Sequence, residues 1–332
     1  MIHQTAKAAS ADARKRSRRS MEAKHRKARS LVHRLASSPA RSAATDEAIA
    51  EIRVLSKHDP EIRAPLADFG AVPLLASALL DRDSSDTEAL ENASAALLNL
   101  SISAREAVMS TSGILDALTA ALRLSYPPAA QHAAATLYSL LSVDEYRPII
   151  GSKRPLVSAL LDLFRRPGGA ATRSIKDALK AIFLLALYPL NRATLVELGA
   201  VPPLFALVVK DGRQGVMEDA TAVISQVAGC YESVDAFRRV AGVAILVELV
   251  DSATGASQRA RENAAAALLN LVMCGGDKAI GDVMEVEGAE AVVRELAEGV
   301  GGGGEVSARG KSKADALLRV LERARGSHLV RG

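Results

Sequence analysis

The feature that most constrains this chain is an internal repeat with a period of about 43 residues. Similar Ala- and Leu-rich segments recur seven times along the 332 residues. They align on one aliphatic position in each copy: Leu55, Leu100, Leu140, Leu185, Val227, Leu271 and Val320. The spacings between successive positions are 45, 40, 45, 42, 44 and 49 residues. A repeat of this length predicts a stack of similar units, each packed only against its neighbours.

A second motif lies between these segments and predicts the internal order of each unit. A glycine that permits a sharp turn precedes a Leu- and Val-rich run in five copies: Gly70, Gly113, Gly199, Gly242 and Gly288. Proline suits the first turn of the helix that follows, at Pro73, Pro155 and Pro202. A short segment with a basic residue comes before: Arg63, Arg105, Arg147, Arg192, Arg238 and Lys278. The predicted unit is a short helix, a turn, a second helix, a loop and a long third helix.

The composition favours a helical array over a compact enzyme. Hydrophobic residues make up 49% of the chain, but aromatic residues only 3%, and Trp is absent. Close-packed helices are well served by Ala, Leu, Val and Ile, which suit a helix interface without aromatic packing. The fold class is therefore predicted to be all-α.

The third segments carry the most specific likeness. ENASAALLNLSI (91–102), RENAAAALLNL (261–271) and AEIRVLSKHDPEIR (50–63) resemble armadillo (ARM) repeats, and more narrowly the ARM array of plant U-box/ARM proteins. Proteins of that family commonly act as E3 ubiquitin ligases. The resemblance covers about residues 46–325. It implies a right-handed α-solenoid of about six ARM repeats, with a concave groove for a protein or an extended peptide.

The predicted domain organisation follows from the repeat and from the charge. Residues 1–42 are expected to form a disordered basic tail, and residues 326–332 a flexible C-terminus. The ARM array spans 43–325, with an N-terminal capping helix (46–57), a glycine linker (299–310) and a C-terminal capping helix (311–325). A U-box is a folded domain placed upstream of the array, whereas the tail is rich in Arg, Ser and Ala without an apolar pattern. We therefore expect no U-box and no catalytic residue in this chain.

Candidate groove residues come from the third helices. The resemblance implies that a residue near the end of each third helix contacts the peptide backbone, here Asn99, Ser139, Gln226, Asn270 and Arg319. An amide side chain suits that role because it both donates and accepts hydrogen bonds. Asn92 and Asn263 lie seven residues earlier and belong to the same polar, slightly acidic rim. We expect an apolar or basic partner segment; the alternative is a solvated helix face with capping residues.

The N-terminal segment differs sharply in charge from the rest of the chain. Residues 1–42 carry a net charge of about +10, and residues 43–332 about −6. The basic side chains predict a bipartite-like nuclear localisation signal over 14–29, read by an import receptor: Arg14, Lys15, Arg16, Arg18, Arg19, Lys24, Arg26 and Lys27. Alternatives are contact with nucleic acid or anionic lipid, a solvated leader, or a tail that lies against the acidic array.

No residue pattern indicates a bound metal, cofactor or small molecule. Cys230 and Cys274 have no metal-binding spacing, and the six histidines are scattered, so we expect no metal, no cofactor and no small-molecule substrate. Without an apolar leader segment, a cytoplasmic or nuclear location is expected. The predicted function is a non-catalytic protein-interaction scaffold in ubiquitin-dependent or signalling pathways. The alternatives are an E3 ligase, or its substrate-binding part with the U-box missing or on another chain, and a nuclear regulatory adaptor.

Overall fold

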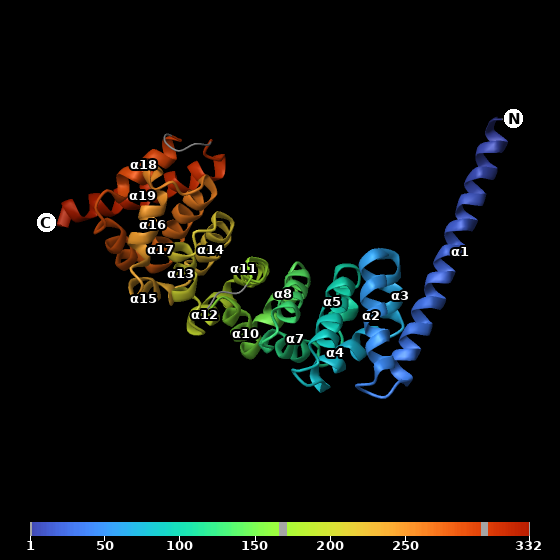
Figure 1. Cartoon of the computed structure of the whole chain (residues 1–332). Coiled ribbons are helices and arrows are strands. Elements are labelled where there is room, and N and C mark those ends of the chain that lie inside the picture. Colours follow the sequence, from blue (N-terminus) through green and yellow to red (C-terminus); the bar gives the residue numbers. More distant parts are fainter. Residues whose placement is uncertain (1, 166–170, 300–304, 332) are drawn as a thin grey trace. The chain divides into compact units, whose positions relative to one another are not determined.

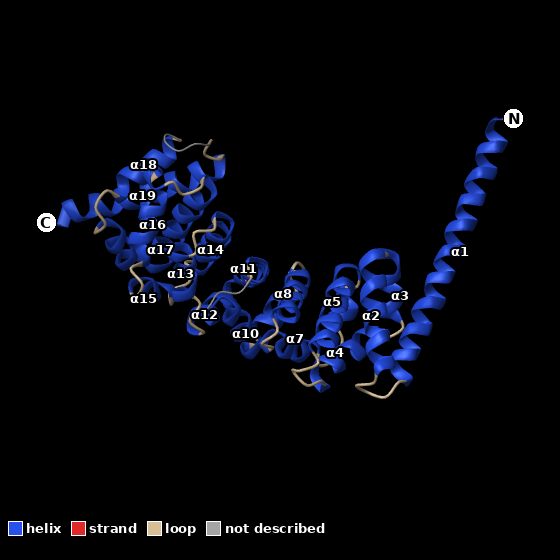
Figure 2. Cartoon of the chain, in the orientation of Figure 1, coloured by secondary structure: helices blue, strands red, loops and turns tan. Residues whose placement is uncertain are grey.

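Every regular element in the part of the chain that the computed structural model describes is a helix (Figure 2). The structure describes residues 2–165, 171–299 and 305–331, and the side chains of residues 17–165, 171–299 and 305–326. The chain divides into two compact units, Met1–Ser142 and Val143–Gly332. In both units, helices follow one another in the predicted order of short, second and long third helix. The predicted all-α solenoid is confirmed.

Unit 1 holds two complete repeats behind two N-terminal helices (Figure 1). The third helices α2, α5 and α8 pack against one another in sequence order, and α4 packs against α7 beside them. The elements are α1 (Ile2–Ser37), α2 (Ala43–His58), η1 (Pro60–Ile62), α3 (Arg63–Asp68), α4 (Ala71–Asp81), α5 (Thr87–Ser103), α6 (Arg105–Met109), α7 (Ile114–Arg123) and α8 (Pro127–Leu141).

Unit 2 continues the same pattern, and its third helices α11, α14, α17 and α19 again pack in sequence order. Its elements are α9 (Tyr146–Gly151), α10 (Arg154–Arg165), α11 (Thr172–Ala186), α12 (Pro189–Glu197), α13 (Val201–Lys210), α14 (Gln214–Val227), α15 (Ser233–Arg238), α16 (Gly242–Val250), η2 (Ser252–Thr254), α17 (Gln258–Met284), α18 (Ala289–Glu298) and α19 (Ala308–Arg331). Helix α17 is kinked at Gly276, where φ is 59°. The kink separates a third helix (258–275) from the short first helix of the next repeat (277–284).

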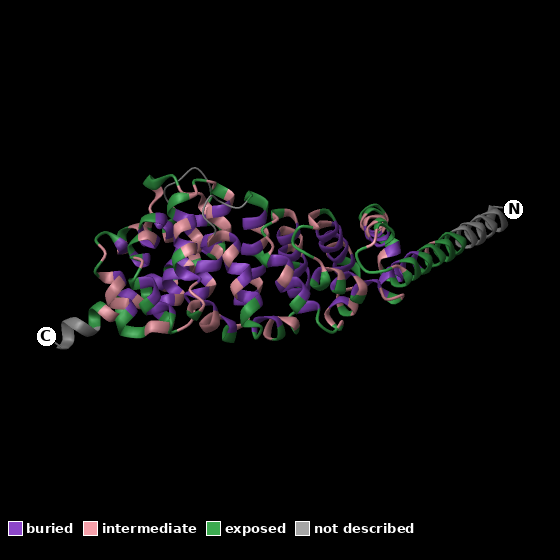
Figure 3. Cartoon of the chain, turned by 60° about the horizontal axis from the view of Figure 1, so that its bottom comes forward, coloured by how far each residue is buried: buried purple, intermediate pink, exposed green. Residues whose placement is uncertain are grey.

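The repeated aliphatic position forms the core of each repeat. The five inner copies are fully buried, at 0% exposure: Leu100, Leu140, Leu185, Val227 and Leu271. The two outer copies, Leu55 and Val320, are half-buried. Buried residues occupy the faces of the helices that meet one another, and exposed residues lie on the rims (Figure 3). This pattern follows from stacking, because a third helix near the end of the series has fewer neighbours than an inner one.

The glycine turn forms as predicted at Gly70, but it is built differently at Gly242. Gly70 ends the short helix in the left-handed conformation, with φ at 91°. At the equivalent turn in unit 2, Ala241 takes the left-handed conformation (φ 51°), and Gly242 is already the first residue of α16. A Cβ atom at Gly242 would lie 2.7 Å from the Phe205 ring. This glycine is therefore required by close packing and not by the turn.

The N-terminal segment departs from the predicted disorder. Residues Ile2–Ser37 form helix α1, whose C-terminal half packs against α2, α3 and α4. An apolar stripe with helical spacing drives this docking: Ala28, Leu31, Val32 and Leu35, each at most 6% exposed. The high charge of the segment obscured this stripe in the sequence. The predicted capping helix 46–57 corresponds to α2, but α1 covers it on one side.

The C-terminal boundary also differs from the prediction. Helix α19 begins at Ala308, inside the predicted linker 299–310, and continues to Arg331, through most of the segment expected to be flexible. Residues 300–304 of the linker lie outside the described residues. No single helix in the described part of the chain is long and apolar enough to cross a membrane. The pairs Pro60–Asp68 with Ala71–Asp81, and Pro189–Glu197 with Val201–Lys210, would reach that length and composition only together, and each pair is bent by 81°.

Candidate protein-binding site

The two predicted groove asparagines, Asn99 and Asn270, make the same contact in their respective units. The Asn99 Nδ2 donates to the backbone carbonyl of Arg53 at 3.3 Å and to Ser56 Oγ at 3.0 Å. The Asn270 Nδ2 donates to the backbone carbonyl of Ser225 at 2.7 Å. Each amide therefore connects its third helix to the preceding one. Asn270 keeps a second N–H and its amide oxygen for other partners.

Two helical turns earlier, the other two asparagines also bridge neighbouring third helices. Asn92 is 7% exposed and accepts a hydrogen bond from the Arg53 guanidinium. The Asn263 Nδ2 donates to the Glu218 carbonyl at 3.2 Å and to Thr221 Oγ1 at 3.3 Å. Asn92 is therefore mainly structural, whereas Asn263 is only half-buried and can also meet a ligand.

The remaining predicted positions differ in how accessible they are. Ser139 is 9% exposed, and its hydroxyl donates to the Ser101 carbonyl at 3.0 Å. Gln226 is half-buried, and its Nε2 lies 3.5 Å from Ser225 Oγ. Arg319 is exposed on α19. Of these three, Ser139 offers the least surface to a partner.

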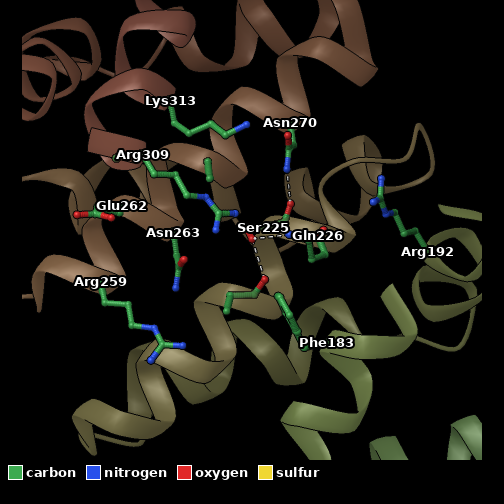
Figure 4. A pocket seen from close by; sticks show the side chains of 13 residues that line it. Phe183, Arg192, Ser225, Gln226, Arg259, Glu262, Asn263, Asn270, Arg309 and Lys313 are labelled. Atoms are coloured by element: carbon green, nitrogen blue, oxygen red, sulfur yellow. Dashed lines mark hydrogen bonds between the residues drawn. The ribbon is translucent and has the colours of Figure 1, made fainter. Parts of the chain in front are cut away.

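Unit 2 contains a cavity of 490 Å³ on the surface of its third helices (Figure 4). Helices α11, α12, α14, α17 and α19 contribute its walls. It brings together three of the predicted groove residues, Gln226, Asn263 and Asn270. The other predicted residues do not line it: Asn92, Asn99 and Ser139 belong to unit 1, and Arg319 lies further along α19.

The charge of this cavity is opposite to the predicted acidic rim. Four cationic side chains line it: Arg192, Arg259, Arg309 and Lys313. Glu262 is the one carboxylate in the lining, and both of its oxygens are occupied by Ser307: Oε1 accepts from the backbone N–H at 2.8 Å, and Oε2 accepts from the hydroxyl at 2.6 Å. Figure 4 shows the Glu262 carboxylate turned away from the interior into which Arg309 and Lys313 reach. The expectation of an apolar or basic partner rested on an acidic rim, which the lining of this cavity does not form.

In the sequence, Arg192 stands out only as one of the recurring basic residues, without a role. The structure supplies one, because Arg192, like Arg63 and Arg105, donates to a carbonyl near the end of a third helix. Arg63 Nε donates to the Ser56 carbonyl at 2.6 Å, and Arg105 Nε to the Ser139 carbonyl at 3.0 Å. Arg192 donates to the Ala186 and Gly229 carbonyls at 2.8 and 3.2 Å. These bonds satisfy carbonyls that helix ends leave free, and they hold Arg192 in place at the edge of the cavity.

Arg309 and Lys313 were missed because they lie in and just after the segment predicted to be a glycine linker. The signal that could have found them is their spacing of four residues, which puts both on one face of a helix. In the structure they stand in the first turns of α19, where the positive end of the helix dipole adds to their charge.

The basic cluster of the N-terminal segment is divided between docked and exposed side chains. Lys24 pairs with Asp59 at 2.9 Å and Glu61 at 2.5 Å, and Lys27 pairs with Glu51 at 2.5 Å. Arg18, Arg19 and Arg26 are exposed, whereas the side chains of Arg14, Lys15 and Arg16 lie outside those described. An import receptor could not bind Lys24 and Lys27 without breaking these ion pairs. Recognition of residues 14–29 as a localisation signal stays a prediction.

The cysteines show no sign of reactivity. Both thiols are free, and burial is the main cause that raises the pKa of Cys230 to about 12 and also raises that of Cys274. A thiol with a raised pKa remains protonated and is a poor nucleophile. Within the described residues, no group of three His, Cys, Asp or Glu side chains is arranged to hold a metal ion.

Comparisons with known proteins agree with this architecture. A family model described as the plant U-box protein ARM repeat region matches residues 28–328. The chain is 33% identical over 279 residues to U-box domain-containing protein 16 of Arabidopsis thaliana, covering 82% of this chain and 38% of that protein. It is 30% identical over 310 residues to U-box domain-containing protein 4 of Oryza sativa subsp. japonica, covering 93% of this chain and 40% of that protein.

Solved structures show the same fold. An engineered protein superposes with a TM-score of 0.74 at 23% identity, covering 89% of this chain and 68% of that one. A designed armadillo repeat protein gives a TM-score of 0.50 at 23% identity, covering 88% and 99%. The chain spans between about a third and three fifths of the length of the first curated relatives that it matches. Since the family model matches nearly the whole chain, this protein belongs to the plant U-box ARM repeat family.

Proposed function

We propose that this chain is a non-catalytic scaffold that binds a segment of a partner protein on the surface of its third helices. The observation that carries the proposal is the 490 Å³ cavity in unit 2, to which four different third helices contribute. Its half-buried amides, Gln226, Asn263 and Asn270, offer both donors and acceptors. Such groups can pair with the backbone of an extended peptide whatever its side chains are.

A second function is favoured by the relatives. Their names describe U-box proteins, and this chain matches 38% and 40% of two of them. We infer that the chain acts as the substrate-binding part of a ubiquitin ligase, with the U-box supplied elsewhere. Purified chain incubated with ubiquitin, E1 and E2 enzymes is expected to form no ubiquitin conjugates alone. Adding a U-box protein should then direct ubiquitin to proteins that the chain binds, and failure to do so would remove this second function.

The scaffold function can be tested by placing a photo-crosslinking amino acid at Gln226, in the cavity. A matched control carries the same amino acid at Val209 on α13, which is 60% exposed in the same unit and does not line the cavity. Circular dichroism would check that both variants keep the helical content of the wild type. We expect extended segments of partner proteins to crosslink at Gln226 and not at Val209. Equal crosslinking at both positions, or none at Gln226, would contradict the proposal.

A further inference from the structure

We propose that the cavity of unit 2 selects an acidic peptide segment, one that carries Asp, Glu or phosphoserine side chains. This inference rests on the proposed scaffold function and adds the chemistry of its partner. The overall sequence points the other way, because residues 43–332 carry a net charge of about −6. The cavity is therefore a local basic surface on an acidic array, which is a condition for selective recognition of anionic groups.

The positive charge of the cavity is not neutralised by its own lining. Arg309 is exposed and Lys313 half-buried, and neither has an ion-pair partner among the described residues. Arg259 has a 65% exposed side chain and lies 4.0 Å from Glu218, at the limit of an ion pair. Arg192 donates to backbone carbonyls, which leave its formal charge in place. Four cations thus face a site whose single lining carboxylate is occupied.

The hydrogen bonds between Ser307 and Glu262 also position the start of α19. By accepting two hydrogen bonds from Ser307, Glu262 fixes the residue that precedes α19. The Ser307 hydroxyl also accepts from the Gly310 N–H at 3.1 Å, as an N-cap residue does. The first turn of α19, with Arg309, is thereby held against the cavity. Gly310 allows this close approach, because a Cβ atom there would lie 2.5 Å from Glu262 Cγ.

The shape of the lining favours a peptide over a small free anion. The cations belong to three segments (α12, the start of α17, and α19), and the half-buried amides Gln226 and Asn270 lie beside them. A single phosphate would meet one or two of these groups. An extended peptide can present acidic side chains to the cations while its backbone pairs with the amides.

The proposal is tested with short fluorescein-labelled peptides of one sequence in which the alternate residues are Glu, phosphoserine, Ser or Lys. Fluorescence anisotropy on the full chain should show the Glu or the phosphoserine peptide, or both, binding at least about tenfold more tightly than the Ser peptide, and the Lys peptide not at all. If the phosphoserine peptide binds more tightly than the Glu peptide, the cavity recognises a phosphate. If the two peptides bind equally, a carboxylate is sufficient. Unlabelled inorganic phosphate should not displace either peptide, and displacement would overturn the choice of a peptide.

Two double variants test whether the acidic peptide binds at the cavity. Arg309→Gln with Lys313→Gln should weaken binding of the acidic peptide about tenfold, since two charge-assisted contacts are lost. The matched control is Lys210→Gln with Arg239→Gln, which removes two exposed charges of the same unit outside the cavity. Binding within twofold of the wild type in the first variant, or an equal loss in the control, would overturn the proposal.

Failure of this inference is distinguishable from failure of the scaffold function. If Ser or Lys peptides crosslink at Gln226 as well as acidic ones do, the cavity binds peptides but does not select acidic ones, and only this inference is lost. If no peptide of any charge crosslinks at Gln226 and no partner segment does so from cell extract, the scaffold function is lost as well.

Discussion

Helices α5 and α17 carry nearly the same sequence, but their side chains have different neighbours, and α17 lines the cavity of unit 2. Both contain Glu-Asn-Ala, then Ala-Leu-Leu-Asn-Leu, at equivalent positions (91–100 and 262–271). In both, the second asparagine donates to the same backbone carbonyl of the preceding third helix, that of Arg53 in unit 1 and that of Ser225 in unit 2. The shared motif therefore determines how third helices pack and does not by itself create a binding site.

The difference comes from the neighbours of the motif. In unit 1, the Arg53 guanidinium reaches Glu91 at 2.8 Å and also Asn92, while the Tyr126 hydroxyl donates to Glu91 at 2.8 Å. In unit 2, the position equivalent to Arg53 is occupied by Ser225, which has a small side chain. Glu262 accepts hydrogen bonds from Ser307, whereas the equivalent Glu91 accepts one from Tyr126. Two large side chains are thus replaced by two serines, and one of them, Ser225, lines the cavity.

The largest expected effect comes from variants of the buried leucine that α5 and α17 share. Leu100→Ala and Leu271→Ala each remove a fully buried side chain from equivalent positions. Each should cost about 2–5 kcal/mol through lost burial and the cavity that remains. Native-state hydrogen exchange, read on α5 for the first variant and on α17 for the second, would measure both. A cost that falls on one helix only would show that the two motifs do not pack alike.

The turns offer a second comparison between the units. Gly242→Ala should cost about 1–3 kcal/mol, because the new methyl group meets the Phe205 ring. Gly70→Ala should cost about 1–2 kcal/mol for a different reason, its left-handed backbone, since nothing lies within 4 Å of the added atom. Thermal unfolding followed by circular dichroism would measure both variants. Adding Phe205→Leu should recover stability at Gly242 only, and recovery at neither site would contradict the assignment.

A third pair of variants exchanges the residues that distinguish the two surfaces. Arg53→Ser should cost about 1–3 kcal/mol, since it removes the ion pair with Glu91 and the hydrogen bond that Arg53 donates to the amide oxygen of the buried Asn92. Ser225→Arg places a long side chain in the cavity of unit 2 and should abolish crosslinking at Gln226. Ser225→Ala is the control, because it keeps the cavity open. Retained crosslinking in Ser225→Arg, with helical content unchanged, would show that this residue does not decide whether the surface is open.

The sequence predicted the repeat and the order of helices in each unit, because periodic burial is a local property that recurs. It assigned the asparagines to a peptide-binding groove and did not predict their hydrogen bonds to the preceding third helix. It did not predict the cavity, because Ser225, Arg309 and Lys313 come from three segments whose juxtaposition depends on packing. The contribution of Ser225 to the cavity could have been found, since the alignment of the repeats gives Ser225 and Arg53 equivalent positions. The docking of α1 was obscured for another reason: its apolar stripe is short and lies within a run of basic residues.

The smallest expected effect concerns the N-terminal end of unit 1, where α1 is held partly by charge, in contrast to the uncompensated charges of unit 2. A hydrogen bond from Lys27, with a further one from Arg34, lowers the pKa of Glu51 below its ordinary value of 4.5. A carboxyl whose pKa is lowered on folding stabilises the docked helix above its unfolded value and loses that effect as the pH falls through the folded value. Hydrogen bonds to Glu61 and Asp59 raise the pKa of Lys24 above its ordinary value of 10.5. Lys24 therefore stabilises the docked helix fully below about pH 10.5, and this stabilisation is lost only at higher pH.

Acid should therefore loosen α1 without releasing it, because the buried stripe from Ala28 to Leu35 is insensitive to pH. Hydrogen exchange of α1 between about pH 7 and pH 3, corrected for intrinsic rates, would show protection falling below about pH 4.5. Glu51→Gln should lower protection at neutral pH by about 1 kcal/mol or less and flatten its pH dependence. An unchanged acid response in that variant would contradict the assignment of the acid sensitivity to Glu51.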